Sequence, residues 1–179
     1  MGNQIKTKRK QFIQHLSHDI EDDEKVWDYL DESLPNIGMI VMYFNGLEKL
    51  LDQILCEMFT DRTDTTGLIV LQNMQYSAKV NLFSRFSNEL HSCLGQVPPH
   101  YEKLLDRLKE AARLRNIVVH ADWESTDEDG YTYVNLKFSD NGMEQEYVQL
   151  SAASLENIVG IILAARKQLG EYWDAKSGI

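Results

Sequence analysis

The sequence contains little cysteine and proline, and it lacks a long hydrophobic run. Its 179 residues include 2 Cys and 3 Pro. We expect Cys56 and Cys93 to be reduced thiols in the core of a cytoplasmic protein, and not a disulfide or a metal site, because both lie in apolar helical patterns with no second ligand nearby and free cysteine is usually buried. The longest apolar run, residues 37–44, is far shorter than the roughly 20 residues that cross a bilayer, so we expect no membrane span.

Positive charge is also scarce. The chain has 18 Lys and Arg against 28 Asp and Glu, which gives a formal net charge of −10. Nonspecific binding to phosphates is driven by Lys and Arg, so this balance argues against a general nucleic-acid coat protein. The charge is uneven, with acids clustered in residues 19–32 and 122–130 and a basic run, KTKRK, at residues 6–10. We interpret these runs as solvated surface, and a local basic groove is the alternative.

The hydrophobic pattern predicts a mainly α-helical protein, built as one antiparallel helical bundle over residues 1–179. Residues 1–35 are expected to form a peripheral N-terminal part, with a helix over 8–31 that Pro35 separates from the next helix. Residues 36–120 carry continuous apolar stripes at helical spacing. They are the predicted core bundle.

The spacing of apolar residues changes after residue 130. Residues 131–150 alternate between apolar and polar, and Asn141 and Gly142 between the two halves accept the positive φ of a tight turn. Residues 151–175 return to helical spacing. We therefore predict one β-hairpin inserted before a C-terminal helix.

Motifs of several common enzyme classes are missing. The sequence has no G-x-S-x-G, no P-loop and no dinucleotide fingerprint. Its histidines and cysteines form no set with the spacing of metal ligands, so we predict neither a metal nor another cofactor.

One short stretch, RNIVVH at residues 115–120, ends the last predicted core helix. Asn116 and His120 are four residues apart and share a helix face, whereas Arg115 lies about 140° from His120 around the axis. A purely structural explanation is open, because the helix dipole favours both Arg and His near a C-terminus. If the residues act together, Arg115 needs its long side chain or a partner molecule to meet the histidine.

The same stretch resembles the signature of the HEPN superfamily (higher eukaryotes and prokaryotes nucleotide-binding): Arg, a polar residue, three variable residues and His. The segments YFNGLEKLLDQIL, MQYSAKVNLFSRF and RNIVVHADW look like the early helix, the middle helix and the motif region of such domains, over roughly residues 36–175. The resemblance implies a helical bundle that acts as a metal-independent endoribonuclease, as among toxins and antiviral defence proteins. It also implies a homodimer with two facing motifs, and for a toxin an antitoxin protein as partner.

The resemblance assigns the catalytic roles to Arg115, Asn116 and His120. RNA carries its own nucleophile, the 2′-OH, so the histidine would transfer protons and the arginine would stabilise charge on the phosphate. Asn116 would orient the histidine or the phosphate. Glu48, an acid in the early helix, is a candidate supporting residue, and its structural alternative is an exposed or lysine-paired glutamate.

Four other residues are candidate RNA contacts: Lys79, Arg85, Tyr76 and Trp123. Solvated surface is the alternative for the two cations, and packing between the motif helix and the hairpin is the alternative for Trp123. The acids that follow His120 would oppose a phosphate. The competing function is a noncatalytic HEPN-like dimeric module that binds a nucleotide or a protein, which a His120 buried under Trp123 would favour.

Overall fold

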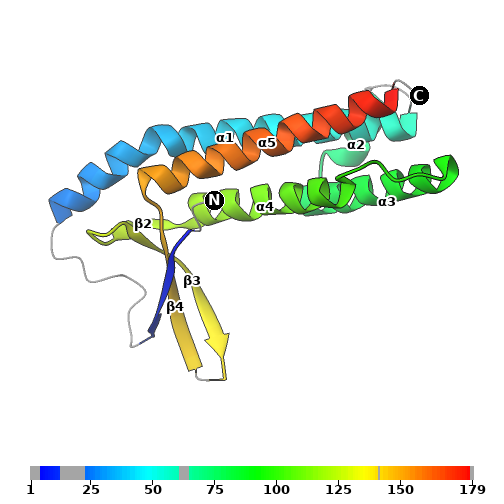
Figure 1. The fold of residues 1–179 in the computed structure, drawn as a ribbon. Helices are drawn as coiled ribbons and strands as arrows, with labels where there is room; N and C mark the ends of the chain where they lie inside the picture. The colour runs from blue at the N-terminus through cyan, green and yellow to red at the C-terminus, as the bar shows by residue number, and fades with distance from the viewer. Residues whose placement is uncertain (1–4, 13–22, 61–64, 141, 178–179) are drawn as a thin grey trace. The chain divides into compact units, whose positions relative to one another are not determined.

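The computed structural model describes residues 5–12, 23–60, 65–140 and 142–177. Over these residues the protein is mainly helical, with five helices and one four-stranded antiparallel sheet (Figure 1). The chain divides into two compact units, each made of two separate segments: unit 1 of residues 1–41 and 114–159, and unit 2 of residues 42–113 and 160–179. None of the described helices combines the length and apolarity that a membrane span needs.

The sheet of unit 1 confirms the predicted hairpin and adds a strand on each side of it. The hairpin consists of β3 (Tyr131–Ser139) and β4 (Gly142–Gln149), and the strand order is β1-β4-β3-β2. Strand β2 (Asp122–Thr126) pairs with β3, and β1 (Thr7–Gln11) pairs with β4. One face of this sheet is covered where Thr132 of β3 pairs with Val148 of β4, because both of these side chains are buried.

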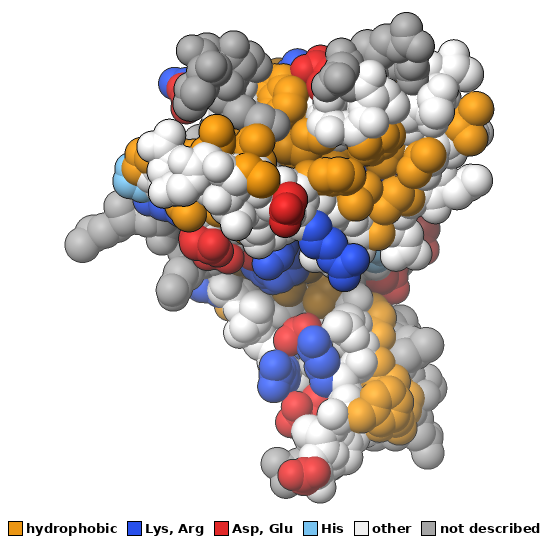
Figure 2. Space-filling view, turned by 90° about the vertical axis from the view of Figure 1, so that its right-hand side faces the viewer, with side chains coloured by type: hydrophobic (Ala, Val, Ile, Leu, Met, Phe, Trp, Pro, Cys, Tyr) orange, Lys and Arg blue, Asp and Glu red, His pale blue; other side chains and the backbone are white. Residues whose placement is uncertain are grey.

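Strand β1 replaces the start of the helix expected over residues 8–31, so that prediction is wrong at its N-terminal end. The segment is stabilised as a strand by partners distant in sequence: Lys8 lies over the Tyr131 ring, and Arg9 pairs with Glu146 of β4, which also binds Lys137. Figure 2 shows such basic and acidic side chains next to each other on the hairpin. His15 and His18, also placed in this helix, lie outside the described residues.

Helix α1 (Asp23–Thr60) runs without interruption through Pro35, so the predicted break there is also wrong. A proline inside a helix removes one backbone hydrogen bond and costs about 3 kcal/mol. Val26, Ser33 and Ile40 are buried on one side of the helix, before and after the proline. Packing of that continuous side outweighs the local cost.

Unit 2 is helical throughout its described residues. It contains the second half of α1, α2 (Thr65–Leu71), α3 (Tyr76–Leu94), most of α4 (Tyr101–His120) and most of α5 (Ala152–Ser177). Helices α1 and α5 lie side by side, joined by a hydrogen bond from Trp173 Nε1 to Glu57 Oε2 of 2.7 Å (Figure 1). The largest fully buried side chains of unit 2 include Phe83, Leu47, Leu51, Ile54, Leu55, Leu71 and Leu108.

The two cysteines are free thiols, but only one is in the core. Cys56 is completely buried on α1, as expected. Cys93 is exposed near the end of α3, so its predicted burial is wrong. The apolar pattern of α3 extends to Leu90, and Cys93 lies on the side of the last turn that faces water.

Helix α2 packs closely against α1 at Gly67. A Cβ at this buried position would lie 2.6 Å from the Cys56 sulfur, which is shorter than the contacts that Cβ atoms make in proteins. Alanine is the better helix former by about 1 kcal/mol, yet we expect Gly67→Ala to destabilise the folded state by about 1–3 kcal/mol because the added methyl overpacks the core. Urea unfolding measures this. In a Cys56→Ala background the same substitution should cost much less, and equal costs in both backgrounds would contradict the contact.

Candidate active site at the end of helix α4

The RNIVVH motif forms the last turns of α4, within unit 1. Leu114 and Val118 are buried and fix the rotation of the helix. At about 100° per residue, Asn116 and His120 then lie on the opposite side, and both are exposed. The histidine is therefore accessible to a ligand from solvent, and within the described residues its imidazole has no hydrogen-bond partner.

Arg115 is half-buried next to this exposed side. Its Nη1 donates a hydrogen bond of 3.0 Å to the Oδ1 of Asn116. The bond holds the guanidinium against the helix surface, while the amide nitrogen of Asn116 remains a donor for a ligand. The motif thus places an amide and an imidazole on one side of the helix end, and a cation about 140° from the imidazole around the helix axis.

Trp123 closes the end of α4. Its Nε1 donates a 3.0 Å hydrogen bond to the carbonyl of Val118, one of the last carbonyls that the helix itself cannot satisfy. The carbonyl of Trp123 in turn accepts a 2.8 Å bond from the Thr126 hydroxyl. Trp123 therefore joins the helix to β2, and it leaves His120 exposed.

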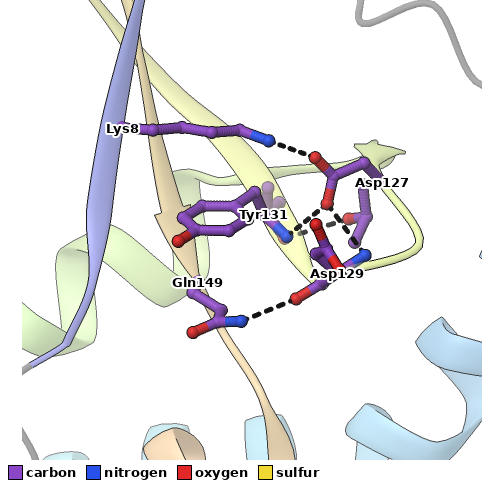
Figure 3. Close-up of polar contacts among 7 residues, drawn as sticks. Lys8, Asp127, Asp129, Tyr131 and Gln149 are labelled. Carbon is purple, nitrogen blue, oxygen red and sulfur yellow. Dashed lines mark hydrogen bonds and ion pairs between the residues drawn. The ribbon is translucent and has the colours of Figure 1, made fainter.

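Two of the acids that follow His120 have partners of their own. Asp122 accepts a 2.8 Å hydrogen bond from the Ser125 hydroxyl. Asp127 pairs with Lys8 and accepts hydrogen bonds from the backbone N–H groups of Asp129 and Tyr131, at 3.1 and 2.9 Å (Figure 3). The ion pair with Lys8 offsets the charge of Asp127, whereas the Ser125 hydroxyl supplies no compensating charge to Asp122.

The turn between β2 and β3 is also tied to α1 through Tyr29. Gly130 has a φ of +76°, and a Cβ at this residue would collide with the Tyr29 phenol. The Tyr29 hydroxyl donates a 2.6 Å hydrogen bond to the carbonyl of Leu150. Burial, together with the charges of Asp127 and Glu32, raises the pKa of Tyr29 to about 12.

The raised pKa predicts alkaline sensitivity. An unfolded tyrosine ionises near pH 10, so the contribution of Tyr29 is complete below about pH 10 and is lost as the pH rises toward 12. We expect Tyr29→Phe to cost about 1 kcal/mol at neutral pH through the lost hydrogen bond, and the gap to wild type to shrink at alkaline pH. Urea unfolding at neutral and alkaline pH tests this. Tyr43→Phe is the control, and a gap that stays constant with pH would contradict the assignment.

The remaining candidate residues belong to unit 2, not to the unit that holds the motif. Lys79 Nζ lies 2.8 Å from Glu48 Oε1 and 2.9 Å from a carboxylate oxygen of Asp52, and the lysine is only 5 % exposed. Lys79 is therefore not the surface lysine that an RNA contact requires, and that prediction is corrected. Glu48 is the lysine-paired glutamate that the sequence left open as its alternative.

Tyr76 and Arg85 differ in their exposure. The Tyr76 ring is half-buried and packs on Phe44, with a centroid distance of 4.7 Å, and burial raises its pKa well above the ordinary value. Arg85 is exposed on α3.

Among the described residues no group of three or more His, Cys, Asp or Glu side chains is placed to hold a metal ion.

Comparisons with protein-family models, with curated proteins and with solved structures found no match to this chain. Functional conclusions therefore depend on the residues at the end of α4 and on their geometry.

Proposed function

We propose that the protein is a metal-independent endoribonuclease of the HEPN type, with a toxin-like or antiviral-defence role in the cytoplasm. The observation that carries the proposal is the exposure of His120 and Asn116 beside Arg115 at the end of α4. A histidine kept for packing would be buried or hydrogen-bonded to the backbone. An exposed imidazole and a cation on the same helix end instead suit a phosphodiester bound between two such motifs.

The reaction follows from the chemistry of these groups. The 2′-oxygen of the RNA attacks the adjacent phosphorus after a histidine removes its proton. The charge that develops on the phosphate oxygens is stabilised by the guanidinium of Arg115, which offers planar donors and stays ionised. The bond to the 5′-oxygen breaks as that oxygen takes up a proton. The products are a 2′,3′-cyclic phosphate and a 5′-hydroxyl.

A two-fold dimer would complete this site. Arg115 and His120 of one chain lie about 140° apart around the helix axis, so they do not converge on one phosphate by themselves. Two motifs facing each other would bring the arginine of one protomer to the histidine of the other, and would supply one histidine as base and one as acid.

The test is cleavage of cellular RNA by the purified full chain in excess EDTA, with analysis of the ends. We expect EDTA-resistant cleavage that leaves 2′,3′-cyclic phosphates. Absence of cleavage by the folded dimer, or cleavage that EDTA abolishes, would overturn the proposal and leave the noncatalytic dimeric module as the better description.

A further inference from the structure

The first half of α1 carries an exposed apolar stripe. Trp27, Leu30 and Leu34 follow the spacing i, i+3, i+7, so they share one face of the helix. Trp27 is 56 % and Leu34 is 51 % exposed and Leu30 between them is half-buried, whereas Val26 and Ile40 on the buried face are below 9 %. Large apolar side chains that adjoin one another at the surface mark sites of interaction.

The stripe borders a hollow in the surface of unit 1. This hollow has a volume of about 250 Å³ and is lined by Val26, Trp27, Leu30 and Glu124. Three of its four lining residues are apolar, and the fourth, Glu124, carries a carboxylate from β2. It suits a side chain with an aliphatic stem and a positively charged end.

Exposed carboxylates flank the stripe on both sides. Glu24, Asp28 and Asp31 follow it along α1, and Glu124 lies across the hollow. Within the described part of the chain none of these four acids forms an ion pair, in contrast to Asp127 and Glu146 of the same unit. The surface is therefore an apolar line between unpaired negative charges, which is complementary to an apolar line between positive charges.

We propose that this surface, formed by Trp27, Leu30, Leu34 and the four flanking acids, binds a basic amphipathic helix of a partner protein. Apolar residues of that helix at i, i+3, i+4 and i+7 would pack on the stripe, and its lysines or arginines would reach the carboxylates. A second copy of this chain fits less well, because its own stripe carries the same acids. The surface includes no motif residue, so the inference is independent of the proposed ribonuclease function.

The probe is a synthetic helical peptide of about five turns, with leucine at the four apolar positions, lysine at the positions that flank them and alanine elsewhere. A matched peptide carries glutamate in place of lysine. Calorimetric titration of the full chain should show one lysine peptide bound per chain, with weaker binding at high salt, and no binding of the glutamate peptide.

Variants then locate the site. Trp27→Ala combined with Leu34→Ala should weaken binding at least about tenfold, and so should Asp28→Lys combined with Asp31→Lys. The control is Glu89→Lys combined with Glu156→Lys, which changes the net charge equally at exposed positions elsewhere and should leave the affinity within about twofold. All substituted side chains are exposed, and circular dichroism verifies the fold.

Three results would overturn the proposal. They are failure of the lysine peptide to bind the wild-type chain, equal loss in the control variant, and unchanged binding in the Trp27 and Leu34 variant. Self-association that the Trp27 and Leu34 substitutions abolish, without peptide binding by the wild type, would assign the stripe to a second copy instead.

Discussion

Replacement of His120 by alanine is expected to lower the rate of RNA cleavage by about 10²–10⁴-fold, the range typical for the loss of a positioned acid or base. The free energy of unfolding should change by less than about 1 kcal/mol, because the side chain is exposed and contributes only through the dipole of α4. This separation of activity from stability distinguishes a catalytic histidine from a structural one. Initial rates on a defined RNA and urea unfolding measure the two quantities.

Arg115→Ala should lower the rate by about 10²–10³-fold through loss of charge stabilisation on the phosphate. Arg115→Lys should recover only part of the rate, since lysine keeps the charge but not the planar pair of donors. The alanine variant should also lose some stability, because Arg115 is half-buried and bound to Asn116.

Matched controls come from the same region of sequence. Arg113→Ala removes an exposed arginine of α4 that pairs with Glu110 at 2.7 Å, and it should leave cleavage unchanged. His100→Asn removes another exposed histidine, and asparagine tolerates the φ of +69° at that position. Equal loss of activity in these controls, or full activity in His120→Ala, would contradict the assigned roles.

The parts of the fold that depend on local pattern were predictable. Helices α3, α4 and α5 carry apolar residues at helical spacing, and in the sequence the pair Asn141 and Gly142 predicts the hairpin of β3 and β4. Strand β1 was not predictable, because the residues that stabilise it, such as Glu146 and Asp127, are more than 100 positions away. Pro35 gave a strong local signal for a break that packing of α1 overrides.

The candidate site was likewise predictable only where it depends on local pattern. Helical spacing alone places Asn116 and His120 on one side of α4, and the structure exposes both. The bond from Trp123 to the Val118 carbonyl and the pairing of Asp127 with Lys8 depend on how the chain turns after the helix, which spacing does not encode. The burial of Lys79 could have been predicted from the sequence, because Lys79 lies four residues before Phe83 and therefore on the buried side of α3.

The buried position of Lys79 leads to the largest expected effect on stability. The ammonium is held by two carboxylates, Glu48 and Asp52, whose side chains are 31 % and 22 % exposed. Burial lowers the pKa of Lys79, but its hydrogen bonds to both acids and their charges outweigh this and raise it. The folded state therefore favours the protonated lysine, and this contribution is present at neutral pH and lost only at strongly alkaline pH.

Lys79→Met should cost about 2–3 kcal/mol of unfolding free energy at neutral pH, because it leaves two partly buried carboxylates without their cation. Burial raises the pKa of Asp52 by more than Lys79 lowers it, so this pKa is already above its ordinary value in the wild type. Removal of the lysine raises it further. Asp52 then takes up a proton as the pH falls, so the cost should shrink at mildly acidic pH. Urea unfolding at neutral and mildly acidic pH measures both values.

Two companion variants decide whether the effect comes from the unpaired acids. Lys49→Met removes an exposed lysine of α1 and should change stability by less than about 0.5 kcal/mol. Asp52→Asn added to Lys79→Met should recover part of the loss, because it removes one of the two repelling charges. A loss that is the same at both pH values and unaffected by Asp52→Asn would mean that Lys79 acts through the packing of its aliphatic stem, and not through its charge.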